Sequence, residues 1–263
     1  MIKRSLFFLF FINFCFAQSQ SKEKVSVTYL FQNNSVANKV FEFDASFIAD
    51  NTSSIYIVLS NTKSKIDENA KISEDDDAIV EKTIDISDGT NVFVYTNLLT
   101  KDIKHRSSIG NKSYKISEKI SNFDWELIEE EKTIGNIVCY KAKTTYRGRD
   151  YIAWYAPSIQ LMFGPWKFSG LPGLILEIYD TQKTFLWTAK SIKYPYKGSQ
   201  ELKEPESSNL MNITLKEFIS KSNKSREKFF KIKKSKMPRG HKILKSETTR
   251  SGIELKYEWE TDK

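Results

Sequence analysis

Residue types that could do chemistry are scarce in this chain. Its 263 residues include two histidines and two cysteines. His105 stands in the basic stretch 104–106, which we expect to be an exposed strand, and His241 follows Pro238 and Gly240. Neither histidine has a His, Cys or carboxylate neighbour at the spacing of metal ligands. The sequence therefore predicts no metal site, no cofactor and no catalytic residue.

A serine or cysteine nucleophile would need one of these histidines as its base. Cys139 lies in the apolar, strand-like stretch 137–140, so we expect a buried, inert thiol. A pairing of Cys139 with His105 stays open, because such partners meet only in the fold. A pair of carboxylates from distant strands leaves no local trace in a sequence. An envelope hydrolase that uses such a pair is therefore the alternative function.

The first residues have the pattern of a secretory signal peptide. Lys3 and Arg4 form a short positive region, and an apolar run of about ten residues follows, against roughly twenty needed to span a bilayer. We expect cleavage after Ala17, which gives a periplasmic or secreted protein. The alternatives are an uncleaved membrane anchor and lipidation at Cys15.

Export has two consequences for the mature chain. Cys15 leaves with the signal peptide, so Cys139 has no disulfide partner, and stability must come from the core. Loss of Lys3 and Arg4 lowers the formal charge from +8 to +6, and the dense basic residues over 221–245 would attract nucleic acid or anionic lipid headgroups. A compartment without nucleic acid argues against the first partner.

Alternation of apolar and polar residues with a period of two predicts a mostly β protein. Turns are expected at Gly110 and Gly135, and hairpins around 147–150 and 180–183. Residues 61–90 are polar and acidic and look like a connection. The expected strands cover 25–29, 41–47, 55–59, 92–96, 101–109, 112–120, 125–133, 138–146, 151–155, 174–179 and 184–192.

The chain changes character near its C-terminus. Thr214-Leu215-Lys216-Glu217 forms a capping box, so we expect one helix over 215–234, and a short strand is expected over 253–259. Basic residues are dense over 221–245, where Glu227 is the only acid. We divide the chain into a signal peptide at 1–17, an antiparallel β domain at 18–200 and a basic helical segment with a tail at 201–263.

The stretch 147–180 has the most tightly specified backbone. Leu171-Pro172-Gly173-Leu174 fits a type II turn, in which Pro172 sets φ and Gly173 supplies the positive φ of the third position. Gly170 would permit close backbone approach. Such a turn usually defines a corner of the fold. The functional alternative is a groove for a hydrophobic ligand or a peptide, lined by Trp154, Met162, Trp166, Phe168, Gly170, Leu171, Pro172 and Gly173.

This stretch also resembles a known family. Gly170-Leu171-Pro172-Gly173-Leu174-Ile175 matches the hexapeptide of the GLPGLI family, exported Bacteroidetes proteins of unknown function. Tyr146-Arg147-Gly148-Arg149 and Gly164-Pro165-Trp166-Lys167-Phe168 are similar to that family's pattern as well. The resemblance is strongest over 137–180. It implies an exported, β-rich protein and no particular chemistry.

These observations predict a single curved antiparallel sheet or half-barrel with one C-terminal helix, similar in shape to the bacterial lipoprotein carriers. The expected function is that of an envelope protein that binds a hydrophobic ligand, a lipid or a protein partner without catalysis. An outer-membrane protein docked on a strand edge is one such partner. Residues 221–245 are expected to be attracted to an anionic membrane surface.

Overall fold

A computed structural model describes residues 23–36, 39–59, 63–66, 91–199, 202–205, 209–236 and 250–260. The expected signal peptide, most of the polar connection at 61–90, and His241 lie outside the described residues.

The described residues form one sheet of 13 strands and one helix. Alternating burial along the strands, as in β1, shows why they form: one face packs on a core and the other meets solvent. The elements are β1 (Val25–Val36), β2 (Lys39–Ala49), β3 (Ser53–Val58), β4 (Lys63–Ile66), β5 (Phe93–Asn97), β6 (Asp102–Ile109), β7 (Lys112–Lys119), β8 (Glu126–Ile134), β9 (Ile137–Tyr146), β10 (Arg149–Ala156), β11 (Leu174–Asp180), β12 (Phe185–Lys193), β13 (Met211–Thr214) and α1 (Leu215–Lys236).

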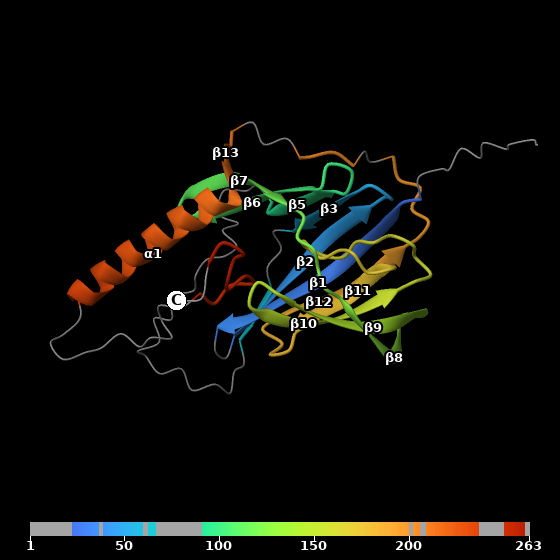
Figure 1. Cartoon of the computed structure of the whole chain (residues 1–263). Coiled ribbons are helices and arrows are strands. Elements are labelled where there is room, and N and C mark those ends of the chain that lie inside the picture. Colours follow the sequence, from blue (N-terminus) through green and yellow to red (C-terminus); the bar gives the residue numbers. More distant parts are fainter. Residues whose placement is uncertain are drawn as a thin grey trace, which may run out of the picture.

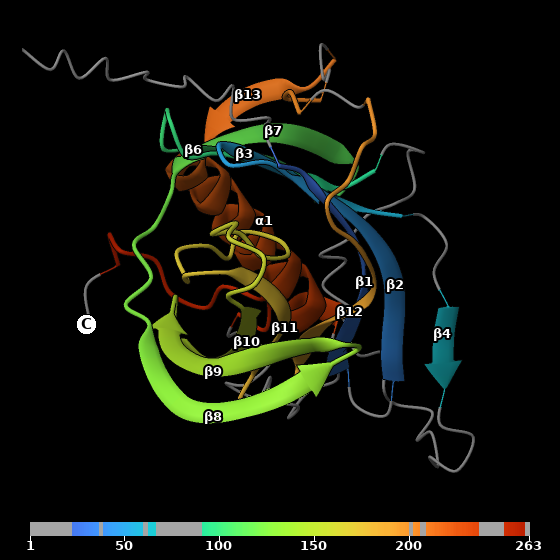
Figure 2. The same cartoon turned by 90° about the vertical axis from the view of Figure 1, so that its right-hand side faces the viewer.

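The sheet is open and strongly curved (Figure 2). Its strand order is β13-β7-β6-β5-β3-β2-β1-β12-β11-β10-β9-β8, and β4 pairs with β2 outside this path. All pairs are antiparallel except β13 with β7, which is parallel. The predicted fold class, a curved mostly antiparallel sheet with one C-terminal helix, is confirmed.

The two predicted hairpins are present. Arg147 and Gly148 form a two-residue loop between β9 and β10, and both have positive φ, 43° and 83°. In a two-residue hairpin loop, positive φ at both central residues gives the turn a twist that matches the right-handed twist of the flanking strands. The second hairpin joins β11 to β12, where the Asp180 carboxylate accepts a hydrogen bond of 2.6 Å from the Phe185 backbone N–H.

Helix α1 begins as predicted. The Thr214 N–H donates to the Glu217 carboxylate at 2.8 Å, and the Glu217 N–H donates to the Thr214 hydroxyl at 3.2 Å, which completes the capping box. The first turns pack Leu215, Phe218 and Ile219 against β7. Beyond them the helix projects away from the sheet (Figure 1). Within the described residues, no helix is both long and apolar enough to cross a membrane.

The strand predicted over 253–259 is wrong. Residues 250–260 contain no strand, because the Leu255 and Lys256 N–H groups both donate to the Arg147 carbonyl instead of forming a ladder with a neighbouring strand. A turn follows, in which the Glu260 N–H donates to the Tyr257 carbonyl. We call residues 250–260 the C-terminal segment. In Figure 2 it lies, in red, on the open side of the curved sheet.

Candidate functional site

The loop between β10 and β11, residues 157–173, lies inside the curve of the sheet (Figure 2). Most of its apolar side chains are buried and join the core, so they occupy much of the concave face. These side chains are Ile159, Leu161, Phe163, Phe168 and Leu171.

The glycines of the GLPGLI hexapeptide serve purposes that differ in part from those predicted. The positive φ predicted at Gly173 is present, 158°, but it is far from the roughly +80° that the third position of a type II turn requires, and the Leu174 N–H donates to the Ile159 carbonyl instead of the Leu171 carbonyl. Gly170 supplies positive φ, 94°. The close approach occurs at Gly173, where a Cβ atom would lie 2.4 Å from the Ala156 carbonyl oxygen.

The structure does not gather the predicted groove residues around one hollow. Trp154 is buried elsewhere, with the Lys132 ammonium group 4.4 Å from its ring centroid. Met162 is 51% exposed, whereas Phe168 and Leu171 belong to the core. Among the eight predicted residues, Trp166 alone lines the cavity described next, and Gly170, Pro172 and Gly173 shape the backbone at the entry to β11.

A cavity of about 200 Å³ lies between the sheet, α1, the 157–173 loop and the C-terminal segment. One wall is a run of aromatic rings: Trp187 stacks on Phe31 with centroids 4.8 Å apart and on Trp166 at 6.2 Å. The Trp187 indole N–H donates to the Tyr56 hydroxyl at 3.1 Å. The opposite wall is Leu215, Phe218, Ile219, Ser222, Asn223 and Arg226 of α1.

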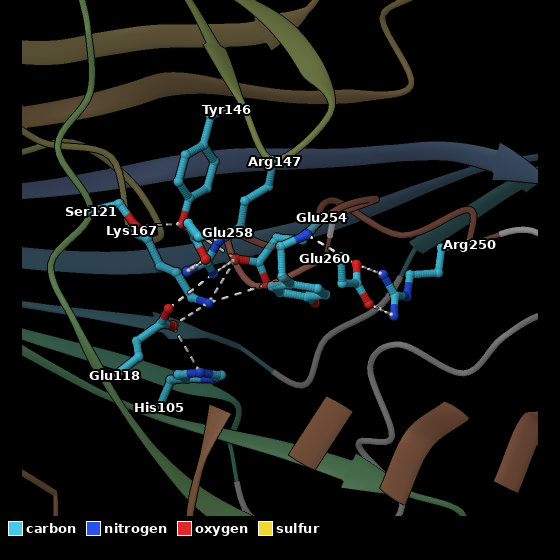
Figure 3. Close-up of polar contacts among 11 residues, drawn as sticks. His105, Glu118, Ser121, Tyr146, Arg147, Lys167, Arg250, Glu254, Glu258 and Glu260 are labelled. Atoms are coloured by element: carbon cyan, nitrogen blue, oxygen red, sulfur yellow. Dashed lines mark hydrogen bonds and ion pairs between the residues drawn. The ribbon is translucent and has the colours of Figure 1, made fainter. Parts of the chain in front are cut away.

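Beside this cavity lies a cluster of buried charges (Figure 3). The Lys167 side chain is 1% exposed, and its Nζ lies 2.5 Å from Glu118 Oε1 and 3.1 Å from Glu254 Oε1. Arg147 Nη1 contacts both carboxylates and lies 2.9 Å from Glu118 Oε2. His105 Nε2 is 3.1 Å from Glu118 Oε1. We call these five residues the ion cluster.

Five parts of the chain position the ion cluster. His105 and Glu118 come from β6 and β7, Arg147 from the β9–β10 hairpin, Lys167 from the 157–173 loop and Glu254 from the C-terminal segment. The cluster also borders a second cavity, of about 710 Å³, which Glu118 and Arg147 line. His105, predicted to be exposed, is therefore buried, because β6 turns it toward the interior of the curve.

The environment of the ion cluster determines its protonation. Burial by itself would raise the pKa of Glu118, but Lys167, the hydrogen bond from His105, and Arg147 together lower it well below the usual range. Burial and the Lys167 charge lower the pKa of His105. At neutral pH Glu118 is therefore ionised and His105 is neutral.

Glu118 is not suited to act as a general acid. Glu118 and Glu254 converge as a hydrolase would require, but a general acid needs a raised pKa, and that of Glu118 is lowered. Cys139 is fully buried, its thiol donates to the Ile137 carbonyl at 3.6 Å, and burial raises its pKa to about 11. A thiol with that pKa is a poor nucleophile at neutral pH. Among the described residues, no group of three or more His, Cys, Asp or Glu side chains could hold a metal ion.

Comparisons with known proteins point to a family without an assigned function. The model of a family described as "Protein of unknown function (Porph_ging)" matches residues 147–177. This range contains the GLPGLI hexapeptide, Arg147 and Lys167. A search of curated proteins finds no match.

Among solved structures, the chain is similar to PNGF-II in two crystal forms. For the P21 form the TM-score is 0.49 and the identity 14%, and the match covers 78% of this chain and 34% of that one. For the C2 form the TM-score is 0.48 and the identity 13%, and the match covers 77% of this chain and 33% of that one. The chain thus spans about a third of the length of PNGF-II, and a similarity of this size carries no argument about function.

Proposed function

We propose that this chain is an exported, non-catalytic binding protein whose ligand is a compact apolar molecule held against the aromatic wall of the 200 Å³ cavity. The observation that carries the proposal is the cavity itself, with Phe31, Trp166 and Trp187 stacked along one side. Ligand pockets are typically concave and lined by apolar and aromatic side chains.

The size and the rim of the cavity limit the ligand. Pockets for drug-sized molecules usually enclose about 300–1,000 Å³, so this cavity fits a smaller molecule or one end of a longer one, such as a lipid chain. Polar groups of His105, Asn223 and Glu254 lie at its border and would orient the ligand. Export rests on the signal peptide expected at 1–17.

A partner docked on a strand edge has less support. The β8 edge carries acidic side chains, and its register with β9 shifts between Ile128 and Glu131. Charges and bulges of this kind hinder pairing with another strand. The cavity is therefore the better candidate site.

The experiment measures binding of the neutral fluorescent probe N-phenyl-1-naphthylamine to the mature protein. Ser222→Trp should fill the cavity from α1 and weaken binding at least tenfold, because Ser222 lines it. Ser220→Trp is the matched control, since Ser220 is exposed on the same helix and should leave affinity within about twofold. Equal affinities for both variants, or no binding by the unmodified protein, would contradict the proposal.

The natural ligand can be sought in the same way. Protein purified from its native envelope should release a small apolar molecule on denaturation, as detected by mass spectrometry. The Ser222→Trp variant prepared identically should release less of that molecule than the Ser220→Trp control.

A further inference from the structure

The C-terminal segment resembles a bound peptide more than an element of the sheet. It contains no helix or strand, and it lies on the open side of the curve between the β9–β10 hairpin and α1 (Figures 1 and 2). Tyr257 packs into a small apolar cluster with Tyr114 and Leu215. The segment therefore bridges two sides of a sheet that does not close on itself.

The main chain of the segment is held by side chains of β10. The Arg149 guanidinium donates to the Gly252 carbonyl at 2.9 and 3.0 Å and to the Ser251 carbonyl at 3.1 Å. The Tyr151 hydroxyl donates to the Ile253 carbonyl at 3.1 Å. In return, the Leu255 N–H donates to the Arg147 carbonyl at 2.8 Å. Contacts to backbone atoms do not depend on the side chains of the bound segment.

One largely buried side chain of the segment, Glu254, is recognised by charged groups. The Glu254 carboxylate contacts Arg147 and Lys167 and accepts a hydrogen bond of 3.4 Å from the Tyr146 hydroxyl. Without Glu254, Lys167 would keep only the Glu118 carboxylate, and Arg147 would keep Glu118 and the largely exposed carboxylate of Glu258. An unpaired buried charge is strongly unfavourable, so this position demands a carboxylate from whatever segment lies there.

The range that matches the family model, 147–177, contains the groups that hold the segment: Arg147, Arg149, Tyr151 and Lys167. The segment itself lies outside that range. The residues that hold the segment are thus part of the matched range, and the segment that they hold is not.

We propose that the β9–β10 hairpin and Lys167 form a binding site for an extended peptide segment that carries one acidic side chain, and that residues 250–260 of this chain occupy that site in cis. The segment also forms one wall of the apolar cavity, but the proposed site is made by other contacts and does not depend on the ligand proposed for that cavity. Arg149 and Tyr151 recognise the main chain, and Arg147 with Lys167 recognises the carboxylate.

The test uses the full mature chain with a protease recognition sequence inserted after Lys245. After folding and cleavage, a fluorescent peptide of residues 250–260 is added in excess, and bound peptide is separated by gel filtration. The cleaved protein should take up the peptide. The intact protein should not, because its tethered segment competes at a high effective concentration.

Two altered peptides test the specificity. E254Q should bind the cleaved protein at least tenfold more weakly, because the buried cations lose their carboxylate partner. E258Q makes the same charge change at a carboxylate that also contacts Arg147, 2.9 Å from its Nε, but is 56% exposed. Because solvent screens an exposed pair, this peptide should lose less than about threefold. Equal loss for both peptides would overturn the assignment of Glu254 as the recognised group.

A second measurement needs no cleavage. In the intact protein, hydrogen exchange at the Leu255 and Lys256 amides should proceed by local opening, faster than exchange at the β9–β10 amides. A cleaved protein that unfolds or stays folded without taking up peptide, or amides in the segment that exchange only with global unfolding, would show that the segment is an integral part of the fold and overturn the proposal.

Discussion

The ammonium group of Lys167 lies deep in the molecule, next to the Trp166 ring and between two carboxylates. A lysine side chain normally keeps its charge in water, and burying that charge is tolerated only when opposite charges are close. Glu118 and Glu254 supply them. The burial of Lys167 therefore depends on its two ion pairs.

Lys167→Met should lower the free energy of unfolding by about 3 kcal/mol, because it removes one partner of a buried ion pair while Glu118 stays buried. Lys190→Met is the control: Lys190 also pairs with an acid, Asp44 at 2.9 Å, but its side chain is 49% exposed. Such a pair contributes less than about 1 kcal/mol. Urea unfolding of the two variants measures the difference, and equal losses would show that the Lys167 pair is not stabilising.

At the scale of elements, α1 has two halves with different environments. Its first turns are buried against β7, whereas Phe229 and Ile232 in the second half are 45% and 46% exposed. Lys221, Lys224 and Lys228 lie three and four positions apart, so they share one face of the helix. This half of the helix presents basic and apolar side chains together, which is typical of helices that lie on anionic membranes.

We expect the mature protein to bind vesicles that contain phosphatidylglycerol more tightly than vesicles of phosphatidylcholine alone. Replacing Lys221, Lys224, Lys228 and Lys231 with Gln should weaken this binding at least tenfold at low salt, since each lysine near the surface contributes about 1 kcal/mol. Sedimentation of vesicles measures the bound fraction. Residues 237–245, the rest of the predicted basic region, lie outside the described residues.

The control for the vesicle experiment removes the same charge elsewhere. Lys101, Lys112, Lys193 and Lys197 are exposed on the β domain, and replacing them with Gln should reduce binding less. If both variants lose binding equally, the attraction comes from net charge and not from α1. High salt should weaken binding of the unmodified protein in either case.

At the scale of the whole molecule, the ion cluster ties together parts of the chain that are far apart in the sequence. Glu118 of β7, Arg147 of the hairpin and Glu254 of the C-terminal segment meet within it. The sheet itself leaves these parts on opposite sides of its opening (Figure 2). The free energy of unfolding should therefore depend on the charge state of the ion cluster, because the cluster holds these segments together.

Unfolding free energy should fall on acidification in two steps. The native pKa of His105 is lowered from 6.5, so below about pH 6.5 the unfolded chain takes up a proton that the native state does not. The native pKa of Glu118 is lowered from 4.5, so its contribution is complete above that value and is lost as the pH falls further. Arg147, Lys167, Glu254 and Glu258 are the other charged groups that contact Glu118 or its partners.

Glu118→Gln isolates the second step. The variant should be less stable than the unmodified protein at pH 7, and the difference should shrink between pH 5 and pH 3, because glutamine has no proton to gain. Urea unfolding at several pH values, followed by tryptophan fluorescence, measures it. A constant difference over that range would show that Glu118 does not have a lowered native pKa.

Part of the ion cluster could have been read from the strand pattern. In β7, Tyr114 and Ile116 are buried, and the same period of two places Glu118 on their face; in β6, Ile103 likewise predicts a buried His105. An acid and a histidine at buried positions of neighbouring strands are a signal of a polar site. No comparable signal marks Lys167 or Glu254, which lie in segments without periodicity.

The sequence by itself determined the fold class, the two hairpins and the helix cap, because alternation, turn residues and capping side chains act over a few neighbouring positions. Only the tertiary structure decided how the GLPGLI glycines are used. A side chain at position 173 is excluded by the Ala156 carbonyl, which belongs to the end of β10. The tertiary structure likewise decided that the 157–173 loop fills the concave face and that Glu254 reaches Arg147 and Lys167. Contacts between residues about a hundred positions apart leave no local pattern in the sequence.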